Sequence, residues 1–421
     1  MFQELKNLIF SKTAKNITLV YSADIFSAII GFAVAVILIR GLSKSDYGLY
    51  TNFIAVMGLI TGVIGSALNY ITVRNGAEYI STHKKVPSRV YGTNFLFQIL
   101  FSLLLLIIII PNSLGLSKFF FGSNLYSKAI LLGGIAAVGF ILIEMARTIF
   151  QTSEKFKKYG VFKIIKQLAL LTGIFLLWKI SRLDFQNVAF LWAGILFILG
   201  AGLFFSVRKW LSFSFKIEQI KELLGGAGWL LAYFVFLALL SRLSIFMLSN
   251  FRSVEEVAVY GVAFRYYGSM LLFLGSINTV FLPKLSKIEY RDTEKQKKFT
   301  NRWVRLSSLT IIPVGIMAIY SKPLMNFLNG PEYTDSIFLF QLFCISIVMS
   351  LIFSPIVNIL IARKEYFFLA ALGFIALVLN FIGNYLFIPI YGAIGATVVI
   401  ILSFAIINIS IYLKVKLVKE Y

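Results

Sequence analysis

The sequence predicts an all-α membrane protein in which twelve transmembrane helices form two pseudo-symmetric six-helix lobes around a central cavity. Three observations predict this fold class: twelve long apolar segments, a repeat between the two halves of the chain, and an uneven distribution of basic residues over the connections. Apolar residues make up 59% of the chain and charged residues 14%. Soluble proteins contain about 45–50% and about 25% of these residues, so we expect the chain to fold in a bilayer.

A helix needs about 20 mostly apolar residues to cross the hydrocarbon core of a bilayer. Twelve segments of the chain meet this condition, and short connections separate them. The predicted spans are residues 17–39, 48–73, 90–110, 129–152, 161–179, 188–207, 229–250, 257–282, 304–320, 337–361, 367–388 and 394–413. Because the number is even, both termini are expected on the same side of the membrane.

The basic residues in the connections predict the orientation. The connections on the side of the termini, among them 154–166 and 284–305, hold 29 of the 40 lysines and arginines, whereas the opposite side holds 8. Cytoplasmic loops carry such an excess, so we expect a multi-pass protein with both termini in the cytoplasm. The net charge of +22 then reflects membrane orientation, and we expect no nucleic acid partner.

The two halves of the chain repeat each other. Tyr47-Gly48 follows the first span and Tyr260-Gly261 follows the seventh, at an offset of 213 residues that also relates the other span boundaries. Parallel repeats of this kind occur in transporters. We therefore predict an N-terminal lobe of residues 1–210 and a C-terminal lobe of residues 211–421.

Two arginines lie deep inside the predicted spans of the second lobe. Arg242 precedes the polar turn after the seventh span by nine residues, and Arg265 follows that turn by nine. Both are then about 13 Å from the outer ends of their helices. An arginine inside the bilayer costs about 2.5–3.5 kcal/mol on insertion scales, and a guanidinium can bind phosphate through paired hydrogen bonds. We interpret the pair as an anion site, and the alternative is that each pairs with an acid such as Asp24 or Glu144.

Asp24, Glu144 and Arg147 lie deep inside predicted spans of the first lobe. Asp24 belongs to a polar stripe of small residues, which indicates either a close helix contact or a cavity wall with a titratable acid. Glu144 and Arg147 are spaced to pair on one helix face, so a structural ion pair is the favoured interpretation. Asp24 is a candidate for substrate binding, and Asp24 and Glu144 are candidates for binding a coupling ion.

Asn380 and Asn384 are spaced four apart in the eleventh span. Carboxamides at this spacing either form hydrogen bonds between helices, which is the favoured interpretation, or line a wet cavity. Both are included among the candidate substrate-binding residues. The single cysteine and single histidine cannot supply the usual zinc ligands. We expect no metal site, no catalytic residue and no cofactor, and leave the energy source open between a proton gradient, a sodium gradient and the membrane potential.

Short motifs along almost the whole chain resemble the Wzx-type flippases of polysaccharide repeat units, the PST branch of the multidrug/oligosaccharidyl-lipid/polysaccharide superfamily. The motifs are Arg40-Gly41-Leu42, Tyr47-Gly48-Leu49-Tyr50, Tyr260-Gly261 with Arg265, Pro283-Lys284-Leu285-Ser286, Gly330-Pro331-Glu332-Tyr333, Asn380 and Asn384 before Ile388-Pro389, and Gly392-Ala393-Ile394-Gly395-Ala396. Each motif is weak alone, whereas their order and spacing are more specific.

The resemblance implies alternating access in a bacterial cytoplasmic (inner) membrane. It implies that undecaprenyl-diphosphate-linked oligosaccharide moves from the cytoplasmic to the outer leaflet for O-antigen, capsule or exopolysaccharide synthesis. Related lipid II flippases bind the diphosphate with cavity arginines, one of them in the eighth span, which corresponds to Arg265. The repeat offset gives Asn52 as the counterpart of Arg265 in the first lobe, and Asn52 joins the candidate substrate-binding residues. Membrane lipids, a polysaccharide polymerase and chain-length proteins are the implied partners.

Two other function classes compete with the flippase. An ion-coupled multidrug exporter of the same superfamily would need acids to dominate its cavity, but the embedded arginines outnumber the embedded acids. A membrane polysaccharide polymerase or ligase would need reactive residues in large outer loops. The longest outer connections, 111–128 and 321–336, contain neither a histidine nor a carboxylate cluster. We therefore do not expect an enzyme.

Overall fold

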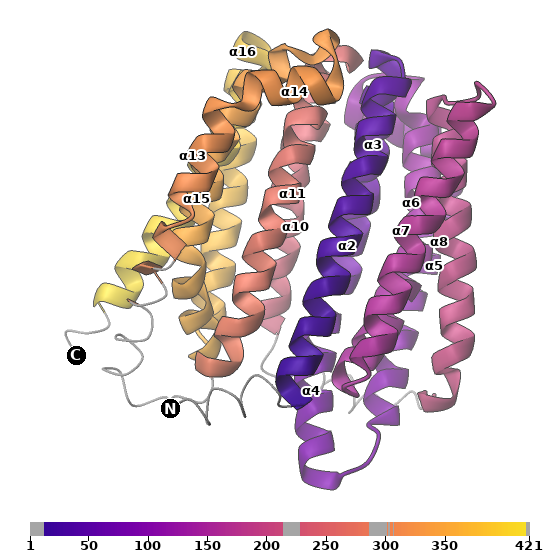
Figure 1. Cartoon of the computed structure of the whole chain (residues 1–421), viewed down its shortest axis with the longest axis vertical. Helices are drawn as coiled ribbons and strands as arrows, with labels where there is room; N and C mark the ends of the chain where they lie inside the picture. Colours follow the sequence, from indigo (N-terminus) through magenta and orange to yellow (C-terminus); the bar gives the residue numbers. More distant parts are fainter. Residues whose placement is uncertain (1–11, 214–227, 286–300, 302–303, 306, 418–421) are drawn as a thin grey trace. The chain divides into compact units, whose positions relative to one another are not determined.

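The computed structural model describes residues 12–213, 228–285, 301, 304–305 and 307–417, and its regular elements in these ranges are all helices (Figure 1). The elements are α2 (Lys12–Gly41), α3 (Lys44–Thr61), the π-helix η1 (Gly62–Ser66), α4 (Ala67–His83), α5 (Ser88–Phe121), η2 (Asn124–Tyr126), α6 (Ser127–Thr152), α7 (Phe156–Lys179), α8 (Phe185–Val207), η3 (Arg208–Trp210), α10 (Gly228–Phe251), α11 (Val254–Leu285), α13 (Ile311–Ile319), α14 (Ser321–Asn329), η4 (Pro331–Tyr333), α15 (Asp335–Ala362) and α16 (Tyr366–Leu417). The all-α prediction is confirmed.

The predicted spans lie mostly on helical residues; in the ninth, residues 309 and 310 form a turn and residue 306 lies outside the described residues. The described residues contain nine helices that are long and apolar enough to cross a membrane, or ten when the bent pair α13 and α14 counts as one span. Helix α16 accounts for two predicted spans in 52 residues, and the 32-residue helix α11 covers the predicted eighth span. The chain is therefore a multi-pass membrane protein.

Three spans differ in detail from the sequence prediction. The second consists of α3, the π-helix η1 and α4 in succession. In the ninth, α13 ends at Ile319, and α14 continues at an angle of 63° to it. The outer part of the third span also extends further than predicted, because α5 continues through Pro111 to Phe121.

The chain forms two compact units. The first contains Met1–Gly41, Val56–Leu114 and Ser127–Ala227, and the second contains Leu42–Ala55, Gly115–Tyr126 and Gly228–Tyr421. The second unit thus includes the first part of α3, which lies far from the rest of that unit in the sequence. The lobe boundaries 1–210 and 211–421 stay a prediction.

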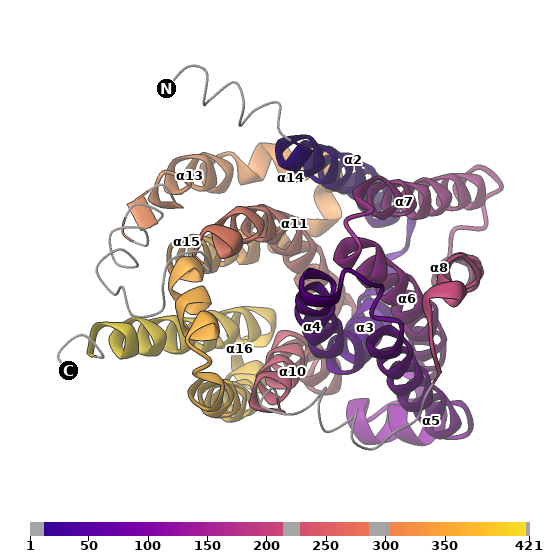
Figure 2. The same cartoon turned by 90° about the horizontal axis from the view of Figure 1, so that it is seen from below.

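The helix pairing inside the two units follows the sequence repeat. In the first unit α2 packs along α7, and α6 packs against α4 and α8 (Figure 2). In the second unit α10 packs along α16, and α15 packs against α11 and α16. The offset of 213 residues relates α2 to α10, α6 to α15, and the second span, which consists of α3, η1 and α4, to α11 and the residues after it. Equivalent spans therefore make similar contacts within each unit.

Helix α16 is interrupted at Gly392, whose φ is 55° and ψ is −132°. The carboxylate of Glu256, near the start of α11, accepts a hydrogen bond of 2.7 Å from the backbone N–H of Ala393 and forms an ion pair of 3.2 Å with Arg252. An acidic side chain is favourable beside the unpaired N–H groups at a helix N-terminus. Glu256 therefore caps the second segment of α16 and ties it to α11.

Candidate functional site

Arg242 lies in the middle of α10 with its guanidinium beside an aromatic ring. Its Cζ atom is 5.6 Å from the centre of the Phe264 ring on α11. Its Nε atom is buried and donates no hydrogen bond to another described residue. A guanidinium over an aromatic face gains a cation–π interaction of about 0.5–2 kcal/mol. That interaction leaves the hydrogen-bonding capacity of Nε unused.

Arg265 follows Phe264 on α11 and lies in surroundings rich in phenol groups. Tyr47 and Tyr50 of α3 are within electrostatic range of its guanidinium. The ring of Tyr47 contacts Tyr333 at a centroid distance of 5.9 Å. The adjacent Tyr266 donates a hydrogen bond of 2.7 Å to Asn329 Oδ1. The two arginines therefore occupy neighbouring helices of one unit, and each lies near aromatic side chains.

Asn52, on the first part of α3, is fully buried and hydrogen-bonded within the second unit. Its Oδ1 atom accepts a bond of 2.9 Å from Ser249 Oγ of α10, and its Nδ2 atom donates one of 3.2 Å to the carbonyl of Gly48. At the preceding residue, α3 approaches α11 so closely that a Cβ on Gly261 would lie 2.2 Å from Thr51 Oγ1. The side chain of Asn52 thus holds helices together in this structure, and a role in substrate binding stays a prediction.

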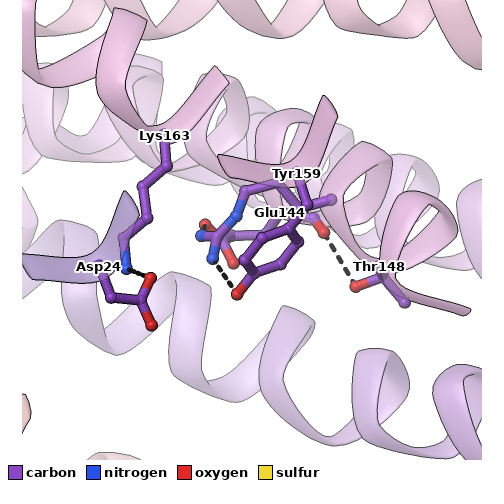
Figure 3. A network of polar contacts seen from close by, with 6 residues as sticks. Asp24, Glu144, Thr148, Tyr159 and Lys163 are labelled. Carbon is purple, nitrogen blue, oxygen red and sulfur yellow. Dashed lines mark hydrogen bonds and ion pairs between the residues drawn. The ribbon is translucent and has the colours of Figure 1, made fainter. Parts of the chain in front are cut away.

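Asp24 on α2 forms an ion pair with Lys163 on α7 (Figure 3). The distance from Asp24 Oδ1 to Lys163 Nζ is 2.5 Å, and the two side chains are 33% and 21% exposed. Helix α7 begins at Phe156, so Lys163 lies inside a helix and not in the connection where the sequence analysis counted it.

Glu144 and Arg147 form the ion pair that their spacing on α6 indicates (Figure 3). Arg147 Nη2 also donates a hydrogen bond of 2.6 Å to the hydroxyl of Tyr159 on α7, and the guanidinium lies 4.5 Å from the centre of that ring. Asp24 and Glu144 each have a basic partner inside the first unit. Neither acid therefore needs Arg242 or Arg265 as its counter-charge.

The Asp24–Lys163 pair predicts a coupled effect on stability. Lys163→Met should lower the midpoint of thermal unfolding, because it leaves the half-buried carboxylate without its basic partner. The double variant Asp24→Asn/Lys163→Met should recover most of this loss, because it removes both charges. Thermal unfolding of the purified variants measures the coupling. A Lys163→Met variant as stable as wild type would show that the pair contributes nothing.

Asn380 and Asn384 lie on the first segment of α16, are fully buried and bond to other helical segments. Asn380 Nδ2 donates to Ser403 Oγ of the second segment at 3.0 Å. Asn384 Nδ2 donates to Asn380 Oδ1 at 2.8 Å and to Ser244 Oγ of α10 at 3.1 Å. This geometry is the interhelical bonding that the sequence favoured. Substrate binding by the two asparagines stays a prediction.

Sequence reasoning missed the side chains that surround the arginines. Tyr47 and Tyr50 are three residues apart, which places them on one face of α3, and this spacing was a visible signal. The cation–π partner Phe264 had no such signal, because 42 phenylalanines are spread over the chain. No group of three His, Cys, Asp or Glu side chains in the described ranges could hold a metal ion.

Solved structures with the same fold include two membrane transporters. The chain is similar to the lipid II flippase MurJ in an inward closed conformation, with a TM-score of 0.75 and 20% identity over 95% of this chain and 87% of that one. It is also similar to an inward-facing multidrug resistance MATE family transporter of the MOP superfamily, with a TM-score of 0.73 and 12% identity over 95% and 97% of the two chains. At these identities the likeness shows the two-lobe membrane fold.

Two curated relatives align with nearly the whole chain. The probable low-salt glycan biosynthesis flippase Agl15 of Haloferax volcanii is 23% identical over 403 residues, which cover 92% of this chain and 80% of the relative. The capsular polysaccharide biosynthesis protein CapF of Staphylococcus aureus is 23% identical over 425 residues, which cover 94% and 98%. The family model of the polysaccharide biosynthesis proteins matches residues 37–338. The chain therefore belongs to the family of polysaccharide biosynthesis proteins.

Proposed function

We propose that the protein is a flippase for undecaprenyl-diphosphate-linked oligosaccharide repeat units. It moves them from the cytoplasmic to the outer leaflet by alternating access, for the synthesis of O-antigen, capsule or exopolysaccharide. Membership of the polysaccharide biosynthesis family, the flippase named among its relatives and the fold shared with a lipid II flippase support this proposal.

The observation that carries the proposal is the presence of Arg242 and Arg265 in neighbouring apolar helices. We assign them to the diphosphate of the substrate. A diphosphate carries at least two negative charges and several acceptor oxygens, and guanidinium groups bind such anions through paired, charge-assisted hydrogen bonds. The undecaprenyl chain can stay in the lipid while the polar head crosses. Asp24, Asn52, Asn380 and Asn384 are the further proposed substrate contacts.

We place the protein in a bacterial cytoplasmic (inner) membrane with both termini in the cytoplasm, on the basis of the basic connections. The proposed partners are the lipid-linked glycan, the membrane lipids, and the polymerase and chain-length proteins that act on the glycan afterwards. Transport of this kind breaks no covalent bond, so we assign no catalytic residue and no cofactor.

Three energy sources fit the charged residues. A proton or a sodium ion could couple to transport through Asp24 or Glu144, and the membrane potential could act on the arginines. One charge that crosses the full potential gains about 2.3 kcal/mol per 100 mV. Flipping in proteoliposomes under each imposed gradient separates the three sources, because only the coupled gradient should accelerate it.

Deletion of the gene tests the proposed function in cells. The deletion strain should lose its surface polysaccharide and accumulate lipid-linked oligosaccharide in the inner leaflet, and the wild-type gene should restore both. Normal surface polysaccharide in the deletion strain would contradict the proposal.

A multidrug exporter is the second candidate, because the fold likeness to a MATE family transporter is nearly as strong as that to MurJ. An exporter of cationic drugs would make the deletion strain hypersensitive to such drugs and leave its polysaccharide unchanged. The two arginines disfavour this candidate, since a cationic substrate would be repelled by them.

A further inference from the structure

Three carboxamide side chains form a cluster in the first unit that the proposed diphosphate site does not use. Asn69 lies on α4, and Asn94 and Gln98 lie one turn apart on α5. Gln98 Nε2 donates to Asn69 Oδ1 and to Asn94 Oδ1, both at 2.8 Å, and Asn94 Nδ2 donates to Asn69 Oδ1 at 3.4 Å. The opposite orientation of the Gln98 amide would set its oxygen against two other carbonyl oxygens. The three amides are therefore oriented together, and in either concerted orientation Gln98 and Asn69 are left with one free acceptor and one free donor between them.

Two polar groups of this cluster remain unused. Gln98 is fully buried, and its Oε1 atom accepts no hydrogen bond from any described residue. A buried acceptor without a partner costs about 1–3 kcal/mol. Asn69 is only half-buried, and its Nδ2 atom donates to no other described residue. The cluster thus presents one unused acceptor and one unused donor.

Both unused groups lie near Gly65 in the π-helix η1. A Cβ built on Gly65 would be 3.7 Å from Asn69 Nδ2 and 3.8 Å from Gln98 Oε1, which is ordinary van der Waals contact. The absence of a side chain at this position leaves room for one small group within reach of both the donor and the acceptor. We call this space the Gly65 notch. Short π-helical turns are rare and occur frequently at functional sites.

We propose that the Gly65 notch binds a hydroxyl group of the sugar in the lipid-linked oligosaccharide. A hydroxyl both donates and accepts, so it can donate to Gln98 Oε1 and accept from Asn69 Nδ2 at once. A phosphate oxygen has no hydrogen for Gln98 Oε1, and an alkyl chain would leave both groups unsatisfied. Among the parts of the proposed substrate, the sugar therefore fits best. This inference rests on the proposed function and adds the sugar subsite to it.

The depth of the notch suits the first contact with the substrate. Asn69 lies four residues before the end of the predicted second span, and Asn94 lies four residues after the start of the third. At 1.5 Å per residue, both are about 6 Å from the predicted cytoplasmic ends of their spans. A sugar that enters from the cytoplasmic leaflet would meet this level of the membrane first.

Affinity measurements on purified protein test the subsite. The probes are undecaprenyl diphosphate and the undecaprenyl-diphosphate-linked oligosaccharide extracted from membranes of the native host. Wild type should bind the sugar-bearing lipid about tenfold more tightly, the effect of two modest hydrogen bonds. Gly65→Ala fills the notch without a clash and should bring the two affinities to the same value. Asn69→Asp keeps the acceptor for Gln98 and Asn94 but removes the donor, so it should also lose the preference.

Gly194→Ala on α8 is the matched control, because a Cβ there meets no other atom within 4 Å. It should keep the tenfold preference, and all variants should keep the wild-type midpoint of thermal unfolding. A Gly65→Ala variant that retains the preference would overturn the subsite. Equal binding of both lipids by wild type would also overturn the sugar subsite, but it would not contradict the diphosphate site. Binding of neither lipid by wild type would overturn the proposed function itself.

Discussion

Arg265→Ala is expected to abolish surface polysaccharide and to weaken the binding of undecaprenyl diphosphate about 100-fold. Hydrogen bonds to charged groups contribute about 1.5–3 kcal/mol each, and a loss of 2.7 kcal/mol lowers an affinity 100-fold. Arg242→Ala should act in the same direction through the neighbouring helix. The measurements are the affinity of purified protein for undecaprenyl diphosphate and the polysaccharide on cells that carry the variant in place of the wild-type gene.

One further variant separates charge from geometry at position 265, and another is the matched control. Arg265→Lys keeps the positive charge but loses the planar pair of donors, so it should retain part of the affinity. Arg89→Ala removes an exposed arginine at the start of α5 and should leave transport unchanged. If Arg265→Ala cells show normal polysaccharide at wild-type protein levels, the diphosphate assignment is wrong.

Gly392→Ala is expected to destabilise the protein by about 1.5–4 kcal/mol. A side chain in the left-handed region costs about 1–2 kcal/mol, and the loss of a helix cap costs about 0.5–2 kcal/mol. Both penalties apply, because φ at this residue is 55° and the new Cβ would lie 1.7 Å from Glu256 Oε1. The carboxylate must leave the N–H of Ala393. A lower midpoint of thermal unfolding in detergent measures the effect.

Gly315→Ala on α13 is the control for this substitution, because a Cβ there meets no other atom within 4 Å. It should be as stable as wild type. Glu256→Ala should destabilise in the same direction as Gly392→Ala, and the double variant should lose less than the two single losses combined, because both remove one contact. Equal stability of the Gly392→Ala and Gly315→Ala variants would refute the cap.

The features that sequence predicted well are those set by composition and by local spacing. The apolar segments predicted which parts of the described chain form long helices, because each helix needs only its own length and hydropathy to cross a bilayer. The Glu144–Arg147 ion pair could be predicted from the sequence, because its two residues are three apart on one helix. The basic partner of Asp24 could not be predicted from the sequence. Lys163 is 139 residues away, and it pairs with Asp24 only because α2 packs on α7.

Helix ends and irregular turns were predicted less well. Span three was expected to end at residue 110, yet α5 continues past Pro111, a residue that membrane helices tolerate better than soluble ones. The break in α16 was expected between the last two spans, but the cap from Glu256 of α11 depends on a contact between residues 137 apart. The π-helix η1 and the amide cluster beside it likewise arise from packing between helices.

Movement of the substrate across a membrane is the most direct test of the proposed function. Purified protein is reconstituted in proteoliposomes loaded with undecaprenyl-diphosphate-linked oligosaccharide, and a glycosidase outside reports how much of the inner-leaflet pool becomes accessible. Wild type should expose this pool over time, whereas Arg265→Ala should leave it as protected as in protein-free liposomes. A wild-type protein that leaves the inner pool protected under every imposed gradient would contradict the account.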